Sequence, residues 1–405
     1  MVKEIEGGVC AAQGFTAGGV HCGIRKNRDK QDLGLLYSSV PCAAAGVYTQ
    51  NKAKGAPILV TQAHLQNGYV QGVVCNSGIA NTCAADGMQT AEAMCRGAAE
   101  ALGIAAEDVA VASTGVIGMS LPMDVILPAM PTLARGLSPQ GGGIFAEAIM
   151  TTDTRRKEVA ATFTLGGKTC HIGGCAKGSG MIHPNMATML GFVTTDAAIA
   201  PVLLQSVLKE VADETFNMVS VDGDTSTNDT LLVLANGLAG NAEITAPGAD
   251  CDAFKAALLY VCTGLSKMMA QDGEGATKLV ECSLCGAPDA QTARVLARAV
   301  ISSSLVKAAM FGADANWGRI LCALGNVDAP FDINKAEVAV SSEAGQVTVC
   351  QNGAGVPFSE EEALAVLQQT KVDILINLHQ GQAQATAWGC DLTYDYVKIN
   401  GDYRT

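Results

Sequence analysis

The chain is built around the sequence Ala176-Lys177-Gly178-Ser179-Gly180-Met181-Ile182-His183-Pro184-Asn185-Met186-Ala187-Thr188-Met189-Leu190. Gly178 and Gly180 permit backbone angles that other residues avoid. Pro184 disfavours the helical conformation for the residue before it. An apolar run at residues 189–193 follows and has the character of a strand. We therefore expect a tightly turned, extended loop that delivers Thr188 to the beginning of a strand.

A hydroxyl in that position is suited to attack on the peptide bond just before it. The Thr188 oxygen could add to the Ala187 carbonyl, shift the acyl group from nitrogen to oxygen, and let water cut the ester. Thr188 would then be a new N-terminus, whose α-amino group has an unperturbed pKa of about 7.7–8.0. That amine could act as a local base for the Thr188 hydroxyl. From the residues alone, a structural role for Thr188 is the commoner alternative.

The same stretch resembles a known family. His183-Pro184-Asn185-Met186-Ala187-Thr188-Met189-Leu190, with Lys177-Gly178-Ser179-Gly180-Met181 before it, resembles the self-cleavage site of the glutamate N-acetyltransferases of arginine biosynthesis, also called ornithine acetyltransferases. Further tracts that resemble this family are residues 51–57, 76–81, 221–229 and 303–320. Together they span almost the whole chain, which excludes a single borrowed motif.

Residues 113–118, Ser-Thr-Gly-Val-Ile-Gly, offer a hydroxyl and glycine-flanked backbone amides just after a buried apolar run. Such donors can stabilise the negative charge that develops on a carbonyl oxygen during acyl transfer. An ordinary turn after a strand is the alternative that the residues leave open. The resemblance assigns Thr114 and Gly115 to an oxyanion hole.

An amino-acid substrate carries a carboxylate, and Lys177 beside the nucleophile loop is a sensible partner for it. An ornithine-like side chain carries a cation, and Glu274 lies between two glycines in a turn. A solvated lysine and a plain loop acid are the alternatives. The resemblance assigns substrate contacts to six positions, all of the matching residue type: Thr151, Lys177, Thr188, Glu274, Asn400 and Thr405. It also implies that the polar C-terminal tail folds into the active site.

Composition limits the class of protein. The chain has 405 residues, 49% hydrophobic and 16% charged, which is ample for a sizeable core. A net charge of −13 disfavours nucleic acid and anionic lipid as partners. The N-terminus lacks the apolar segment of a signal peptide, so we expect a cytoplasmic protein. The fifteen cysteines indicate reduced core thiols, and one CxxC at Cys282 and Cys285 is weak evidence for a metal site.

The aspartates of residues 221–229 are the other candidate metal ligands. Asp222, Asp224 and Asp229 lack the terminal glutamate of a calcium-binding EF-hand loop. We interpret this tract as structural or pocket-lining.

The pattern of apolar runs and glycine turns predicts an α/β protein. Two threonine-bearing runs flank Gly166-Gly167 and predict a hairpin at residues 158–170. Other expected helices are at residues 89–102, 201–214, 251–269, 290–309 and 359–369, and other expected strands at 46–51, 71–78, 109–112, 231–234, 320–324 and 372–378. Pro288 and Asp289 indicate a boundary between a main domain, residues 1–285, and a smaller α/β domain, residues 286–385. Residues 386–405 form the tail. The resemblance implies a layered α/β sandwich of the ornithine acetyltransferase type.

The resemblance also implies the reaction. The acetyl group of N-acetylornithine would pass to Thr188 and then to glutamate, with no metal or organic cofactor. The chain would be cut into residues 1–187 and 188–405, which stay associated as a dimer of such pairs. Whether acetyl-CoA is also a donor is left open. The alternatives are a self-processing aminopeptidase or amidohydrolase of similar architecture, and a non-catalytic protein that binds small molecules.

Overall fold

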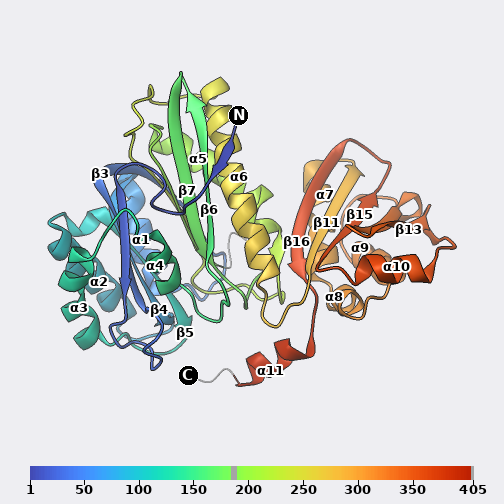
Figure 1. Ribbon diagram of the computed structural model, residues 1–405, viewed down its shortest axis with the longest axis horizontal. Helices are drawn as coiled ribbons and strands as arrows, with labels where there is room; N and C mark the ends of the chain where they lie inside the picture. Colours follow the sequence, from blue (N-terminus) through green and yellow to red (C-terminus); the bar gives the residue numbers. More distant parts are fainter. Residues whose placement is uncertain (184–188, 403–405) are drawn as a thin grey trace. The chain divides into compact units, whose positions relative to one another are not determined.

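The computed structural model describes residues 1–183 and 189–402. Ala187, Thr188 and Thr405 therefore lie outside the described residues. The chain divides into two compact units. The first contains Met1–Gly178, Asn185–Phe216 and Thr225–Leu265, and the second contains Ser179–Pro184, Asn217–Asp224 and Ser266–Thr405. Each unit has its own sheet, and the expected α/β class is confirmed (Figure 1).

The first unit is built on one mixed sheet. Its strands follow the order β1-β6-β7-β8-β10-β3-β4-β5, and β2 pairs with β3. The strands are β1 (Lys3–Ile5), β2 (Phe15–Val20), β3 (Leu33–Tyr48), β4 (Tyr69–Ile79), β5 (Val109–Val116), β6 (Lys157–Leu165), β7 (Lys168–Lys177), β8 (Leu190–Thr195) and β10 (Thr230–Ala235). The pairs β4–β5 and β8–β10 are parallel, and the remaining neighbours are antiparallel.

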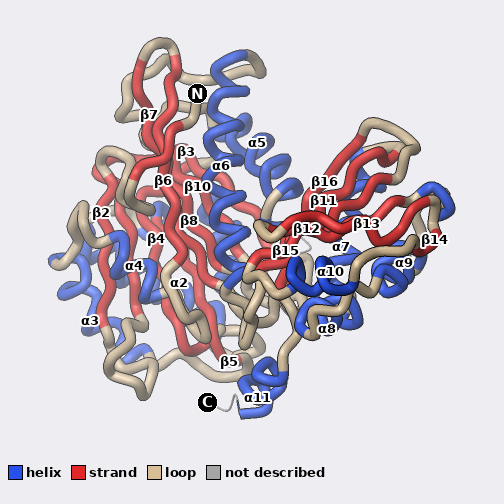
Figure 2. The backbone as a smooth tube through the Cα atoms, turned by 45° about the vertical axis from the view of Figure 1, so that its right-hand side comes forward, coloured by secondary structure: helices blue, strands red, loops and turns tan. Residues whose placement is uncertain are grey.

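Helices lie on both sides of this sheet (Figures 1 and 2). They are α1 (Ala56–His64), α2 (Gly87–Leu102), α3 (Met123–Arg135), α4 (Gly142–Ala148), α5 (Pro201–Glu214) and α6 (Ala249–Gln271), with 3₁₀ turns η1 (Leu65–Asn67), η2 (Ala106–Asp108) and η3 (Phe216–Met218). The ends of α6, from Ser266, and of η3, from Asn217, belong to the second unit. Successive strand residues point to opposite faces. Leu35 of β3 accordingly joins the core beneath α1 to α3, while Leu36 joins the core that contains Phe145 of α4.

The β6–β7 hairpin confirms its prediction. Gly166 and Gly167 have φ angles of 51° and 79°, the two positive values that a two-residue hairpin turn of this kind requires. The turn fixes the register, which places Lys157 opposite Ala176. The beginning of β6 therefore lies beside the end of β7, where Lys177 is found.

The second unit has a sheet in the order β14-β13-β12-β15-β11-β16-β9. Its strands are β9 (Val219–Ser220), β11 (Leu279–Ala287), β12 (Glu337–Ser342), β13 (Gly345–Gln351), β14 (Ala354–Gly355), β15 (Lys371–Asn377) and β16 (Ala383–Cys390). Its helices are α7 (Ala290–Ser302), α8 (Ser304–Phe311), α9 (Trp317–Gly325), α10 (Glu360–Leu367) and α11 (Tyr394–Asp402), with a 3₁₀ turn η4 (Ile333–Lys335). Helix α7 packs on β11 and β16, and α10 packs on β12 and β13.

Two predicted elements of the second unit are wrong. The strand expected at residues 320–324 is helix α9, because Asn316 accepts a hydrogen bond from the Arg319 amide and caps a helix there. Ile320, Ala323 and Leu324 are buried at helical spacing. The single helix expected at residues 290–309 is two helices, α7 and α8, because Ser303 breaks the run and caps α8.

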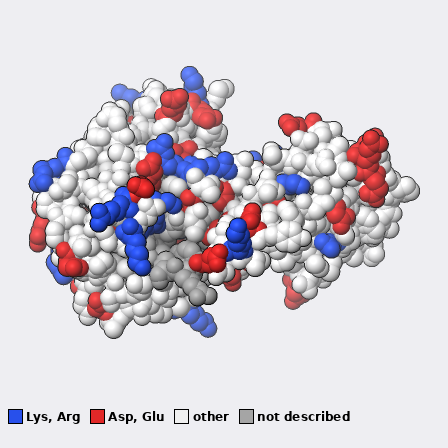
Figure 3. All heavy atoms as spheres, turned by 60° about the horizontal axis from the view of Figure 1, so that its bottom comes forward, with Lys and Arg blue, Asp and Glu red and all other residues white. Residues whose placement is uncertain are grey.

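None of the helices in the described part of the chain has the length and apolar character that a bilayer crossing requires. Charged side chains are scattered among larger uncharged areas on the face drawn in Figure 3, with both signs present. This agrees with the low charged content of the sequence.

Candidate active site

The residues predicted to form an oxyanion hole lie at the end of a buried parallel strand. Thr114 of β5 pairs with Ser77 of β4, and only 9% of Thr114 is exposed. Gly115 has a φ of 132°, and a Cβ atom there would lie 2.2 Å from the Gly78 carbonyl carbon. Only glycine fits this close approach of two backbones. The Thr-Gly pair is thus fixed by the close parallel pairing of the ends of β4 and β5.

One amide side chain holds this strand end in place. Asn228 Nδ2 donates hydrogen bonds to the carbonyls of Ser113, at 3.0 Å, and Ala80, at 2.5 Å. Asn228 Oδ1 accepts from the Thr82 hydroxyl at 2.5 Å. Asn228 stands just before β10, so it ties β5 and the loop after β4 to the middle of the sheet. The sequence reasoning gave this residue no individual role.

Asp229, the next residue, contacts the described residue that follows Thr188. Its carboxylate accepts a hydrogen bond from the Met189 amide, and the Thr230 amide donates to the Met189 carbonyl at 2.8 Å. Asp229 is buried, and burial raises its pKa well above the usual range, an effect that nearby Lys177 opposes. Among the described residues its Oδ2 atom has no hydrogen-bond partner. The beginning of β8 is therefore held by β10 through both backbone and side chain.

Two predicted substrate contacts, Thr151 and Lys177, lie around the carboxylate of Asp153, which bonds the Thr151 amide and the amide of the residue after Lys177. Asp153 accepts hydrogen bonds from the Thr151 amide at 2.9 Å, the Gly178 amide at 2.7 Å and Lys157 Nζ at 2.6 Å. The side chains of Asp153 and Lys157 are fully buried. One carboxylate thus fixes the loop before β6 and the turn that follows Lys177.

The charges around Asp153 decide its protonation state. Burial alone would raise the pKa of this carboxyl, but the cations of Lys157 and Lys177 outweigh burial and lower it to about 2. Asp153 is therefore an anion throughout the physiological range. Burial lowers the pKa of Lys177, and the charge of Asp153 opposes that change. The buried lysine beside this anion is suited to hold the carboxylate of an amino acid.

In the second unit, Glu274 and Asn400 lie together. Asn400 Nδ2 on α11 donates to Glu274 Oε2 at 2.7 Å, and the Glu274 amide donates to the Ser179 carbonyl at 2.9 Å. A Cβ atom at Gly180 would lie 2.3 Å from the Glu274 carboxylate. Glycine at position 180 therefore leaves room for the carboxylate. Glu274 presents the anion that a cationic side chain requires.

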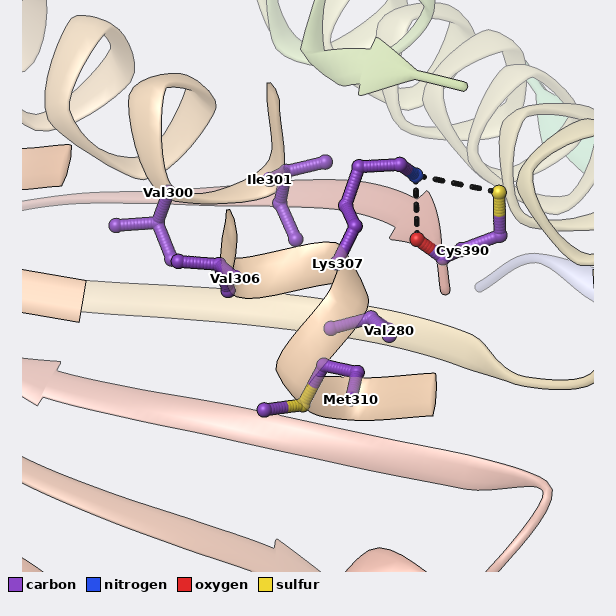
Figure 4. A pocket seen from close by; sticks show the side chains of 7 residues that line it. All are labelled: Val280, Val300, Ile301, Val306, Lys307, Met310 and Cys390. Carbon is purple, nitrogen blue, oxygen red and sulfur yellow. Dashed lines mark hydrogen bonds between the residues drawn. The ribbon is translucent and has the colours of Figure 1, made fainter. Parts of the chain in front are cut away.

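The segment that leads into α11 is fixed by buried polar contacts. Asp391 accepts hydrogen bonds from the Thr277 amide at 2.8 Å and the Lys278 amide at 3.0 Å. Lys307 Nζ points at Cys390 and donates to its carbonyl oxygen, with Cys390 Sγ at 3.4 Å (Figure 4). The small space drawn there is otherwise lined by apolar side chains, namely Val280, Val300, Ile301, Val306 and Met310. We interpret it as a packing site around a buried lysine rather than a ligand pocket.

The predicted site residues thus fall into three groups. Thr114, Gly115, Thr151 and Lys177 lie in the first unit, and Asp153 brings Thr151 and Lys177 together. Glu274 and Asn400 are paired in the second unit. Ala187, Thr188 and Thr405 lie outside the described residues. Sequence reasoning missed Asp153, because its bond to the Gly178 amide and its charge interaction with Lys177 join residues that are far apart along the chain.

Comparison with known proteins identifies the family. The model of the ArgJ family matches residues 16–405. The arginine biosynthesis bifunctional protein ArgJ of Symbiobacterium thermophilum is 54% identical to this chain, and that of Bacillus subtilis is 47% identical. The alignments cover all of this chain in both cases, and 100% and 98% of those proteins. The chain belongs to the ArgJ family.

A solved structure supports the same assignment. The crystal structure of the ArgJ protein from Bacillus halodurans is 46% identical with a TM-score of 0.50, and its whole chain covers 53% of this one. The prediction of an arginine-biosynthesis enzyme is thereby confirmed for this ArgJ-family chain.

The buried pair of Asp153 and Lys157 generates a prediction about stability. Asp153→Asn removes the negative charge from beside the buried Lys157 ammonium, so the free energy of unfolding should fall by roughly 3–5 kcal/mol. Lys157→Met should also lower the free energy of unfolding, because it leaves the buried Asp153 carboxylate without this cation. The double variant should recover part of the loss, because neither charge is then left in the core. Urea denaturation of the four proteins measures the cycle, and strictly additive losses would contradict a coupled pair.

Proposed function

We propose that this ArgJ-family enzyme is a self-cleaving glutamate N-acetyltransferase that takes the acetyl group of N-acetylornithine. The single observation that supports this most is the buried Asp153–Lys177 cluster beside Thr151 at the end of β7. This cluster places the Lys177 side chain where it can bind an amino-acid carboxylate. Lys177 comes directly before the glycine-rich loop that leads to Thr188 in the sequence. A non-catalytic binding protein predicts instead a chain that stays intact on a denaturing gel.

The proposed self-cleavage step needs no reactant other than water. The Thr188 hydroxyl adds to the Ala187 carbonyl, the peptide nitrogen leaves as the Thr188 α-amine, and water hydrolyses the resulting ester. The Met189 amide donates to the Asp229 carboxylate, and the Met189 carbonyl accepts a hydrogen bond from the Thr230 amide, so the residue directly after Thr188 is held in place. The solved Bacillus halodurans chain, which covers 53% of this one, has the length expected of one of two such fragments.

The proposed transfer proceeds in two halves. The Thr188 hydroxyl attacks the acetyl carbonyl of N-acetylornithine, its proton passes through the α-amine to the departing amine, and ornithine leaves. The amine of glutamate then attacks the acetyl ester, and the proton returns to the threonine oxygen. Thr114 and the Gly115 amide stabilise the oxyanion in both halves. Lys177 binds the substrate carboxylate, and Thr151, Glu274, Asn400 and Thr405 complete the substrate contacts.

A second acetyl donor is a further part of the proposal. The relatives from Symbiobacterium thermophilum and Bacillus subtilis are both named bifunctional. We therefore propose that acetyl-CoA also acetylates Thr188. Formation of acetylglutamate from acetyl-CoA and glutamate, with no acetylornithine present, is the assay for that donor. The two fragments would remain associated, as a dimer of such pairs.

Self-cleavage is the first prediction of this proposal. The purified protein should separate into Met1–Ala187 and Thr188–Thr405 without added protease, because the nucleophile and the scissile carbonyl are neighbours. Thr188→Ala should stay full length and inactive, whereas Thr188→Ser keeps a hydroxyl and should still be cut. Intact mass spectrometry and N-terminal sequencing measure this. The absence of any chain that begins Thr-Met-Leu-Gly would contradict the proposal.

Thr114 generates the second prediction. Thr114→Ala should lower the rate of acetyl transfer by roughly 10²–10³-fold, since a donor to the oxyanion is lost. Ser113→Ala is the matched control, because adjacent strand residues face opposite sides and the buried Ser113 hydroxyl has no partner among the described residues. That variant should keep a rate close to wild type. Equal rates for Thr114→Ala and wild type would remove Thr114 from the mechanism.

A further inference from the structure

Asp222 forms a junction in the second unit between two segments that are far apart in sequence. Its Oδ2 accepts a hydrogen bond from the Met181 amide at 2.6 Å, and its Oδ1 accepts one from the Ile182 amide at 2.9 Å. The Tyr396 hydroxyl of α11 donates to the same carboxylate. One side chain therefore joins the loop at residues 181–182 to the C-terminal helix.

The loop side of this junction holds a strained backbone. Met181 has a φ of 54°, in the left-handed region that residues other than glycine rarely adopt. Its side chain is 44% exposed and so gains little from packing. The hydrogen bond from its amide to Asp222 stabilises this conformation, and the Val221 amide donates to the Ile182 carbonyl at 2.6 Å. Asp222 thus fixes the backbone at residues 181 and 182.

The helix side of the junction positions a predicted substrate contact. Tyr396 and Asn400 are four residues apart, and residues at that spacing lie on one face of a helix. Asn400 bonds Glu274, and the Thr393 hydroxyl donates to the Gly275 carbonyl at 2.7 Å. Helix α11 has no buried residue of its own, so its docking rests on these polar contacts and on the edge-to-face contact of Tyr394 with Phe311 of α8, whose ring centroids are 5.6 Å apart. Along the chain, the hydrogen bond from Tyr396 to Asp222 lies between the Thr393 and Asn400 contacts.

We propose that Asp222 is a positioning residue that serves both steps of the proposed function, on which this inference rests. Through Met181 and Ile182 it orients the loop for self-cleavage. Through Tyr396 it holds α11, and with it Asn400, against Glu274 for binding of acetylornithine. The two roles use different donors to one carboxylate, so they can be separated by substitution.

Three variants separate the two roles. Asp222→Ala should slow self-cleavage and raise the KM for acetylornithine. Tyr396→Phe should be cleaved at the wild-type rate, yet its KM should rise roughly ten-fold with kcat little changed, since a hydrogen bond to a charged group is lost. Asp224→Asn, at an exposed carboxylate two residues along, should match wild type in both measurements. In the Asp222→Ala background, Tyr396→Phe should have no further effect on KM.

Hydrogen exchange supplies a readout that does not depend on activity. Peptides from α11 should exchange faster in both Asp222→Ala and Tyr396→Phe, and the peptide with residues 181–183 should do so only in Asp222→Ala. A wild-type chain that neither cleaves nor transfers acetyl would contradict the proposed function, while the exchange pattern would still test the junction. Wild-type KM and exchange in Tyr396→Phe would overturn the inference. Cleavage slowed equally by Tyr396→Phe would also overturn it, since the roles would then not be separate.

Discussion

The buried carboxylate of Asp153 is the interaction on which the first half of the candidate site depends. It is fully buried with Lys157, and it accepts hydrogen bonds from backbone amides on both sides of the β6–β7 hairpin. A buried anion is tolerated only when its donors are all in place, because an unpaired charge in the core is costly. This requirement fixes the turn after Lys177 and the backbone at Thr151 together. The negative charge of Asp153 also acts on Lys177. Burial lowers the pKa of Lys177, and this charge opposes that change.

In the second unit, other carboxylates hold loops in the same way, by accepting hydrogen bonds from backbone amides. Asp222 and Asp391 each accept several backbone amide hydrogens, and Asp391 holds the segment just before α11. These acids count toward the net charge of −13, although the Asp391 side chain is buried and does not face solvent. The acidic composition therefore has two origins. One is the surface, and the other is a set of carboxylates that organise loops around the residues proposed to bind substrate.

Sequence reasoning predicted the elements whose cause is local. The hairpin follows from Gly166-Gly167, and the helix at residues 201–214 begins at Pro201, which suits the first turn of a helix. Helix α9 was missed because its apolar run fits a strand equally well, and only the Asn316 cap decides. Helix α11 was also missed, since a polar chain end shows no apolar face. The positions of the candidate site residues came from resemblance to a family. The carboxylates that hold them could not be predicted, because each also bonds an amide far along the chain, which comes close only after folding.

The central claim is that an acetyl group passes through Thr188, and trapping that acetyl-enzyme is its most direct test. The cleaved protein is mixed with N-acetylornithine in the absence of glutamate, quenched in acid within the first turnover, and analysed by mass spectrometry. The account predicts that the fragment beginning at Thr188 gains one acetyl group on that residue, and that added glutamate removes it as acetylglutamate. Acetylglutamate formed at the normal rate with no acetyl group ever found on Thr188 would contradict it.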